Sequence, residues 1–353
     1  MIARAAVQCL FLLMLAILWP NTINTARAGE NPDEAGQAAT GKIKTFVDDL
    51  GDTLRWETRP QRIVSLSPNI TELLFALGVS GETAGSSSRS GSSLGPLPGD
   101  QKIVGVTRFC DEPPEALTIY NVGGIVDPSL EAILSAEPDL VFVTRGNPRT
   151  FIESLRQLNI PLYAMDPNGP LQDLVEAMKR VGYAAGRAGE ADALAADLKA
   201  RLAVLEKRFG ALPQEKKPRV YYGSIEPPLW TAGPGSTIDD IIRIAGGANI
   251  ADDAPTPWCI YTLESVIAQN PQILLGVYPA GQKDAERRRI MHLLAESPGW
   301  KDTELGMIQQ VCLIEENVLM RPGPRIVLAA ENAARCFHPA EFSRDKTNPN
   351  GGH

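Results

Sequence analysis

The stretch that decides the fold covers residues 171–210 and reads LQDLVEAMKRVGYAAGRAGEADALAADLKARLAVLEKRFG. Its second half places apolar side chains at steps of three and four residues, the spacing of a single helix face: Leu194, Leu198, Leu202, Leu205 and Phe209. Glu190 near its start and Lys207 near its end suit the helix dipole. We predict one helix of about 20 residues, roughly 30 Å long at a rise of 1.5 Å per residue. Such a rod can join two lobes and hold their spacing.

Segments typical of strands and helices alternate on both sides of this rod. Before it, strands are expected at 62–66, 103–106, 140–144 and 161–165, and helices at 71–77, 130–136 and 150–158. After it, strands are expected at 219–222 and 272–277, and helices at 237–244 and 263–268. A hairpin is expected at 45–56. This alternation predicts an α/β fold of two doubly wound lobes joined by a single long rigid helix, with ligands at the carboxyl ends of the strands.

Two domains are expected because 353 residues exceed what one hydrophobic core usually serves. We predict an N-terminal lobe at residues 45–168, helices that include the connecting helix at 169–212, and a C-terminal lobe at 213–342. The leader at 29–44, a Ser-, Gly- and Pro-rich insertion at 85–100 and the tail at 343–353 are expected to be disordered.

The first 28 residues are typical of a cleavable signal peptide. Arg4 precedes an apolar run at residues 7–19, and Ala26-Arg27-Ala28 has the small-x-small form of a cleavage site. The apolar run is too short to span a bilayer comfortably. No cysteine follows it at a lipoprotein-type cleavage position, because Cys9 lies at its start. We therefore expect a soluble mature protein that is exported to the periplasm.

The expected mature chain is acidic. Residues 1–28 contain two arginines and no acids, so their removal changes the balance from 34 basic and 42 acidic residues to 32 against 42, a net charge of −10. This charge disfavours nucleic acid and anionic membrane surfaces as partners. The three histidines, His292, His338 and His353, do not cluster, which argues against a zinc or manganese receptor and against a metal site.

Motifs of enzymes are also missing or out of context. Residues 91–95 read GSSLG and match the nucleophile elbow of hydrolases. The elbow needs a following helix, however, and Pro96 and Pro98 prevent one. No P-loop and no G-x-G-x-x-G after a strand occurs. An exported α/β enzyme is therefore the disfavoured alternative, and no catalytic residue and no cofactor are expected.

Four cysteines remain after residue 28: Cys110, Cys259, Cys312 and Cys336. Their even number in an oxidising compartment allows two disulfides, with three possible pairings. We favour Cys312 with Cys336, because both fall near the core of the last lobe. Cys110 and Cys259 fall in expected loops, where they are compatible with a disulfide, with thiolate ligands of a metal, or with buried thiols; we expect buried thiols.

An internal repeat supports the two-lobed interpretation. Residues 129–140 (SLEAILSAEPDL) align without gaps on residues 262–273 (TLESVIAQNPQI), which makes Glu131 equivalent to Glu264. Residues 71–78 have a looser counterpart at 238–247. The two offsets differ, so these are equivalent units of two lobes and not a tandem array. The alternative is that any two junctions between a helix and a strand look alike.

Two motifs resemble a known family. Residues 62–78 (RIVSLSPNITELLFALG) are similar to the opening motif of the substrate-binding proteins of ABC importers for cobalamin, haem and ferric siderophores. Residues 106–116 (VTRFCDEPPEA) resemble a segment of the cobalamin-binding branch, and the other branches usually lack its Asp-x-Pro-Pro pattern. The resemblance covers residues 45–342. It implies a helical-backbone fold and a corrinoid, such as cobalamin, as transported ligand, with haem or a ferric siderophore as the alternative.

The resemblance also implies site residues. Trp258, expected in a loop before a helix, matches a ligand-stacking tryptophan, and Phe109 falls where that branch has an aromatic residue. The ligand is expected in a largely preformed cleft between loops that contain Ser67, Pro68, Asn69, Phe109, Cys110, Asp111 and Glu112 on one side, and Trp258, Tyr261, Arg321 and Arg325 on the other. The chain departs from the branch where Glu112 replaces a frequent tyrosine and where Ile125, Thr144 and Val318 occupy positions that can be tryptophan.

Partners follow from the same resemblance. Glu131 and Glu264 fall on the paired surface glutamates, one per lobe, that dock onto arginines of a permease. The implied partners are an ABC permease and its ATPase in the inner membrane, and the binding protein itself is expected to be a monomer.

Overall fold

The computed structural model describes residues 43–81, 101–166 and 168–345. The predicted signal peptide, most of the leader, the insertion at 85–100 and the tail from 346 lie outside these residues. The described chain forms two compact units. The first contains residues 43–75, 79–81, 101–166 and 184–186, and the second contains 76–78, 168–183 and 187–345.

A five-stranded sheet forms the centre of the first unit. All of its strands are parallel, in the order β4-β5-β3-β6-β7. Their bounds are β3 (Arg62–Ser65), β4 (Ser80–Gly81), β5 (Lys102–Val106), β6 (Leu140–Thr144) and β7 (Leu162–Met165). Every residue of β6 is buried, as expected for a strand covered on both faces.

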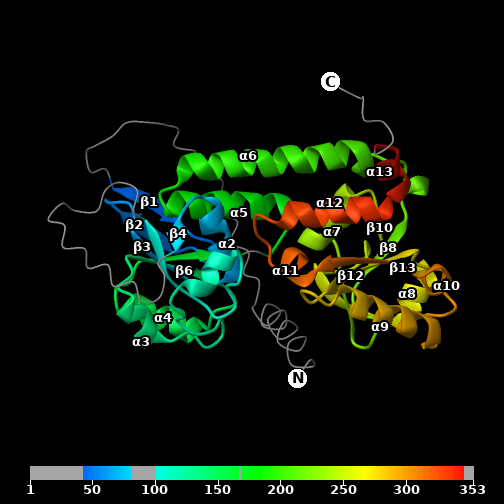
Figure 1. The fold of residues 1–353 in the computed structure, drawn as a ribbon, viewed down its shortest axis with the longest axis horizontal. Helices are drawn as coiled ribbons and strands as arrows, with labels where there is room; N and C mark the ends of the chain where they lie inside the picture. The colour runs from blue at the N-terminus through cyan, green and yellow to red at the C-terminus, as the bar shows by residue number, and fades with distance from the viewer. Residues whose placement is uncertain (1–42, 82–100, 167, 346–353) are drawn as a thin grey trace. The chain divides into compact units, whose positions relative to one another are not determined.

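Helices cover both faces of this sheet. One face packs against α3 (Leu130–Ser135) and α4 (Arg149–Gln157) through a core that includes Val64, Val141 and Ile133 (Figure 1). The opposite face, which carries Ser65, contacts α2 (Pro68–Ala76). A short 3₁₀ turn, η1 (Pro114–Thr118), lies in the connection after β5.

The expected hairpin is present and is fixed by one carboxylate. Strands β1 (Lys44–Val47) and β2 (Thr53–Trp56) pair antiparallel, and the rings of Phe46 and Trp56 stack at 5.5 Å. The Asp48 side chain accepts hydrogen bonds from the amides of Leu50, Asp52 and Ala164 at 2.8–3.0 Å. The last of these bonds attaches the turn to β7, and burial raises the pKa of Asp48.

The second unit contains a parallel sheet in the order β10-β8-β12-β13 and a separate antiparallel pair, β9 with β11. The bounds are β8 (Arg219–Tyr222), β9 (Leu229–Ala232), β10 (Ala248–Asn249), β11 (Trp258–Tyr261), β12 (Ile273–Tyr278) and β13 (Gln310–Glu315). Helices α8 (Leu263–Gln269) and α9 (Lys283–Glu296) cover one face, and α12 (Ile326–Phe337) covers the other (Figure 1). The remaining helices are α7 (Thr237–Ile244), α10 (Glu304–Ile308), α11 (Glu316–Leu319) and α13 (Pro339–Asp345).

The stretch at 171–210 forms two helices, α5 (Leu171–Ala184) and α6 (Ala188–Leu205), and α6 continues as a π-helical turn over Glu206–Gly210. The predicted apolar stripe is buried except for Leu194, which is half-buried. It packs in the second unit, where Arg201 of α6 pairs with Glu331 of α12 at 2.8 Å. The turn at 184–186 belongs to the first unit, because Trp56 and Gln101 donate hydrogen bonds to the carbonyls of Ala184 and Ala185.

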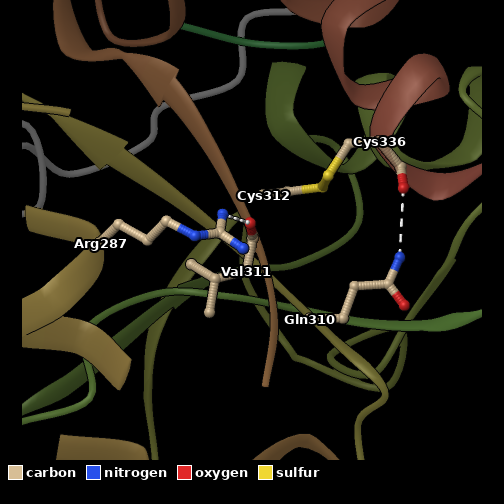
Figure 2. Close-up of a disulfide and its surroundings, with 5 residues drawn as sticks. All are labelled: Arg287, Gln310, Val311, Cys312 and Cys336. Atoms are coloured by element: carbon tan, nitrogen blue, oxygen red, sulfur yellow. Dashed lines mark hydrogen bonds between the residues drawn. A yellow bond between two sulfur atoms is a disulfide. The ribbon is translucent and has the colours of Figure 1, made fainter. Parts of the chain in front are cut away.

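A disulfide joins Cys312 of β13 to Cys336 of α12, with their Cα atoms 5.9 Å apart (Figure 2). This is the pairing favoured from the sequence. Beside it, the Gln310 amide donates a hydrogen bond to the Cys336 carbonyl at 3.2 Å. Cys110 and Cys259 are free thiols.

Three local predictions were wrong. Helix α2 begins at Pro68 and not near Thr71, because proline has a φ suited to the first helical turn and lacks only an amide that would be unpaired there. Residues 258–261 form strand β11 and not a loop, since β9 supplies a pairing partner. Residues 343–345, expected in the tail, belong to α13. Within the described ranges, no helix is long and apolar enough to cross a membrane.

Candidate ligand-binding site

The carboxyl ends of β3, β5 and β6 lie at one edge of the first sheet, because these strands are parallel neighbours. Asn147, which is 4% exposed, connects the loops at this edge. Its side-chain oxygen accepts a hydrogen bond from the Thr144 amide at 2.8 Å, and its nitrogen donates to the carbonyls of Ile125 at 2.8 Å and Leu66 at 3.4 Å. Sequence reasoning missed this residue, although a polar side chain three residues after a buried strand was the available signal.

Ser67, Pro68 and Asn69 lie at this edge as the start of α2. The Ser67 hydroxyl donates to the side-chain oxygen of Asn69, and both residues are buried. Thr71, one turn later, donates to the hydroxyl of Ser65 at 2.8 Å. These contacts fix the beginning of the helix, so the sequence-predicted turn is a rigid part of the edge.

Cys110 is held at the same edge as a structural thiol. Cys110 is 3% exposed, and its sulfur lies 3.2 Å from the hydroxyls of both Thr71 and Thr107. No group of metal-binding side chains is present among the described residues. Cys110 is therefore the buried thiol expected from the sequence, whereas Cys259 is only partly buried.

Phe109 and its neighbours follow β5. The Phe109 ring is half-buried and carries the Arg108 guanidinium 4.9 Å from its centre, while Arg108 also pairs with Asp127 at 2.8 Å. This cation–π contact restricts the ring at the sheet edge. Asp111 is exposed and Glu112 is partly exposed, and the Glu112–Pro113 peptide bond is cis.

Trp258 occupies the corresponding part of the second unit. Its ring is half-buried and meets Tyr222 edge to face, with ring centres 6.1 Å apart and planes at 68°. Tyr222 is the last residue of β8, and its hydroxyl donates to the Met320 sulfur at 3.0 Å. Trp258 is therefore held near the carboxyl end of the central sheet by an aromatic pair.

Tyr261 and Cys259 share strand β11 with Trp258. The Tyr261 hydroxyl bonds to the Asp253 carboxylate and lies 3.2 Å from the Ile250 carbonyl. Burial, followed by the nearby Asp253 charge, raises the pKa of the Cys259 thiol. The raised pKa favours the protonated thiol, which is the less nucleophilic form of a cysteine.

The two predicted arginines lie beyond β13. Arg321 and Arg325 are partly buried residues in the segment between α11 and α12, and the Arg325 guanidinium donates to the Asn317 carbonyl at 3.3 Å. These two arginines therefore place positive charge in the segment that follows the carboxyl end of β13.

Glu131 and Glu264 occupy matching positions in the two units. Each is an exposed second residue of a helix, α3 or α8. The preceding cap is also matched, since Ser129 accepts from the Ala132 amide at 3.2 Å and Thr262 accepts from the Ser265 amide at 3.1 Å. Neither glutamate forms an ion pair with another described residue. The repeat seen in the sequence is thus a repeat of local structure.

The profile of the family described as "Periplasmic binding protein" matches residues 63–316. The chain belongs to the periplasmic binding protein family. A substrate-binding lipoprotein of an ABC transporter from Bacillus subtilis (strain 168), YvrC, is 24% identical over 96% of the chain and 98% of its own length. The vitamin B12-binding protein of Photorhabdus laumondii is 27% identical over 77% of the chain and 86% of its own length.

A solved structure agrees with this membership. The periplasmic haem-binding protein RhuT of Roseiflexus sp. RS-1 is 28% identical, with a TM-score of 0.61 over 79% of the chain and 98% of its own length. The predicted fold class is confirmed. As a periplasmic binding protein, the chain is a transport-associated solute-binding protein and not an enzyme, and an extracytoplasmic location is consistent with its relatives.

Proposed function

We propose that this periplasmic binding protein captures a corrinoid, either cobalamin or a precursor, and delivers it to an ABC permease served by an ATPase in the inner membrane. Its relatives include proteins named for cobalamin and for haem, so the choice of ligand depends on the residues of this chain. The observation that carries the proposal is a pair of anchored aromatic rings, Phe109 and Trp258, each near the carboxyl ends of the strands of one sheet.

The anchored rings suit a broad, largely apolar ligand. Phe109 is restrained by Arg108, and Trp258 is restrained by Tyr222. Rings that are already fixed lose little conformational entropy when a flat ligand stacks on them. We propose that both rings contact the corrin, together with the polar residues of the two edges predicted from the sequence: Ser67, Pro68, Asn69, Cys110, Asp111, Glu112, Tyr261, Arg321 and Arg325.

The positions and existing contacts of several candidate haem-iron ligands favour the corrinoid. Haem iron takes an axial ligand from the protein, such as histidine, tyrosine, cysteine or methionine, whereas a corrinoid can carry its own axial ligands. Of the described histidines, His292 lies within α9, and His338 follows α12 and stacks on Phe209 at 5.0 Å. The Tyr261 hydroxyl is already bonded to Asp253, and burial keeps the Cys259 thiol neutral.

A ferric chelate is the second candidate. Arg321 and Arg325 follow the carboxyl end of β13, and guanidinium groups suit the carboxylate or catecholate oxygens of such a chelate. A ferric chelate would occupy the same site as the corrinoid, but the arginines and not the aromatic rings would contribute most of its affinity.

Export and docking complete the proposal. We propose cleavage after Ala28, an N-terminal lobe at 45–168 and a C-terminal lobe at 213–342, with residues 169–212 between them. Glu131 and Glu264, each exposed and placed by a helix cap, are proposed to meet permease arginines. Sequencing the N-terminus of the protein recovered from the periplasm tests the cleavage position.

The ligand is tested by titrating the purified protein with cyanocobalamin, dicyanocobinamide, haem and a ferric siderophore, measured by absorbance and calorimetry. We expect tight binding of a corrinoid, and a loss of about tenfold or more in affinity for Trp258→Leu and Phe109→Leu, because each loses roughly 1.4 kcal/mol or more of stacking. Phe46→Leu, in the β1–β2 hairpin, is the matched control. Binding of haem or a ferric chelate alone would reject the corrinoid assignment.

A further inference from the structure

Strand β13 is the outer strand of the second sheet, and a cavity runs along it. Among the described strands, its one neighbour in the strand order is β12. The cavity has a volume of about 460 Å³, and its lining includes Val311, Leu313 and Glu315 of the strand. Residues of α9 and α12 close it on either side: Lys283, Arg287, Asn332 and Arg335. Its volume is in the range of sites that bind ligands.

The outer edge of β13 presents backbone hydrogen-bonding groups. The Arg287 guanidinium donates to the Val311 carbonyl at 2.9 Å, as Figure 2 shows, so this carbonyl points away from β12. In a parallel strand, alternate residues turn their amide and carbonyl to the same side. Leu313 and Glu315 therefore share the outward orientation of Val311. A six-residue strand such as β13 offers an edge of about 20 Å at 3.3 Å per residue.

The charges around this edge are mostly positive, although the chain as a whole has a net charge of −8. Lys283, Arg287 and Arg335 are exposed, and among the described residues that line the cavity Glu315 is the one acid. Within the described part of the chain, none of the three cations forms an ion pair. Lys283 lies over the Tyr278 ring at 5.6 Å, and Arg335 lies 5.8 Å from the Phe342 ring. Contacts with aromatic rings thus hold Lys283 and Arg335 in place without neutralising their charge.

This combination points to one kind of occupant. A backbone edge pairs with an extended strand, and a cationic border selects acidic side chains. A second copy of the chain is disfavoured, because pairing β13 with itself would bring together the same three cations. A small anion would use the cations but leave the strand edge unpaired.

We infer that the outer edge of β13 binds an extended acidic segment of a partner protein by strand addition. An amide of that segment replaces the Arg287 guanidinium at the Val311 carbonyl, and the released guanidinium pairs with a carboxylate of the segment. The disulfide to α12 holds the strand in place during this exchange. None of the residues proposed to contact the transported ligand lines this cavity, although Val318, at one of the positions that can be tryptophan in cobalamin binders, does.

The test uses the full mature protein and a fluorescein-labelled peptide of alternating glutamate and valine, followed by fluorescence anisotropy. We expect binding with a dissociation constant below about 100 µM at low salt, weakened several-fold at high salt because the charges are screened. Hydrogen exchange should slow across 311–315. A peptide with alternate amides N-methylated keeps the charges but cannot pair with a strand, and it should not bind.

Substitutions test whether the positive charges are needed for peptide binding. Lys283→Gln with Arg287→Gln and Arg335→Gln should weaken peptide binding at least tenfold, and Arg288→Gln, an exposed neighbour on α9, should leave it unchanged. Three results would overturn the inference: equal binding of the N-methylated peptide, no binding at about 1 mM peptide, or dimerisation of the wild type that the triple substitution abolishes. The peptide comparison stands even if the triple variant does not fold.

Discussion

The disulfide between Cys312 and Cys336 should dominate the stability of the second unit. It closes a loop with a sequence separation of 24. In the chain-entropy model, cross-linking a loop of this length raises the free energy of unfolding by about 3.5 kcal/mol at 25 °C. A unit of this size loses roughly 2–4 °C of melting temperature per kcal/mol, so reduction should lower its melting temperature by roughly 7–14 °C.

The assay is differential scanning calorimetry of the chain from Gly29, with and without a phosphine reductant, because two units can melt separately. Reduced wild type isolates the covalent bond, since both sulfurs remain. Cys312→Ala with Cys336→Ala should melt at or below the reduced wild type and should not respond to reductant. Cys259→Ala, which removes a free thiol, should respond like the wild type.

Thiol titration provides an independent check. The denatured, oxidised chain from Gly29 should contain two reactive thiols, Cys110 and Cys259, and the reduced chain should contain four. Four thiols without reductant, or a melting temperature that reductant changes by less than about 1 °C, would refute the reasoning.

Three further predictions concern docking, pH and the first sheet edge. Glu131→Ala with Glu264→Ala should abolish ligand uptake in cells while calorimetry finds unchanged ligand affinity. Glu153→Ala, at a partly exposed glutamate of α4 that pairs with Arg149, is the control, and a loss of affinity would contradict the docking role. Burial lowers the pKa of His338 in the folded chain, so the unfolded state binds a proton more readily. The free energy of unfolding should therefore be highest above a pH of about 6.5 and should decrease as the pH falls below it. The free energy of unfolding, measured by urea denaturation across this pH range, should depend less on pH for His338→Phe, which keeps the stack on Phe209. An unchanged dependence on pH would show that His338 is not the group responsible. Asn147→Ala should lower the free energy of unfolding by about 2–3 kcal/mol, because it leaves buried backbone groups unpaired, and Asn332→Ala, an exposed amide, should change it little.

Local patterns were sufficient for much of the fold. Helix α7 has the predicted bounds, because Ser236 caps it and its apolar residues repeat at helical spacing. The strand and helix order of both units, and the stripe of α6, follow from the same kind of signal. The relation of Glu131 to Glu264 was visible because the caps, Ser129 and Thr262, are preserved with the helices they begin.

Features that depend on distant partners could not be predicted. Strand β11 exists because Trp258 to Tyr261 pair with β9, and no short-range pattern in that segment names its partner. Asn147 matters because of carbonyls at positions 66 and 125, which only the folded chain brings to it. Arg287 is one of three consecutive arginines at 287–289, and its bond to Val311 depends on the packing of α9 beside β13, which no local pattern indicates.

The matched caps of α3 and α8 have a consequence for how these surfaces can change. Because Ser129 and Thr262 fix where each helix starts, the position of the following glutamate is a property of the main chain and not of its neighbours. Other outward-facing residues of the two helices can therefore be substituted without moving the glutamate. A designer could exploit this by moving the four-residue module, cap through capped amide, onto another scaffold to present an acid at a chosen place.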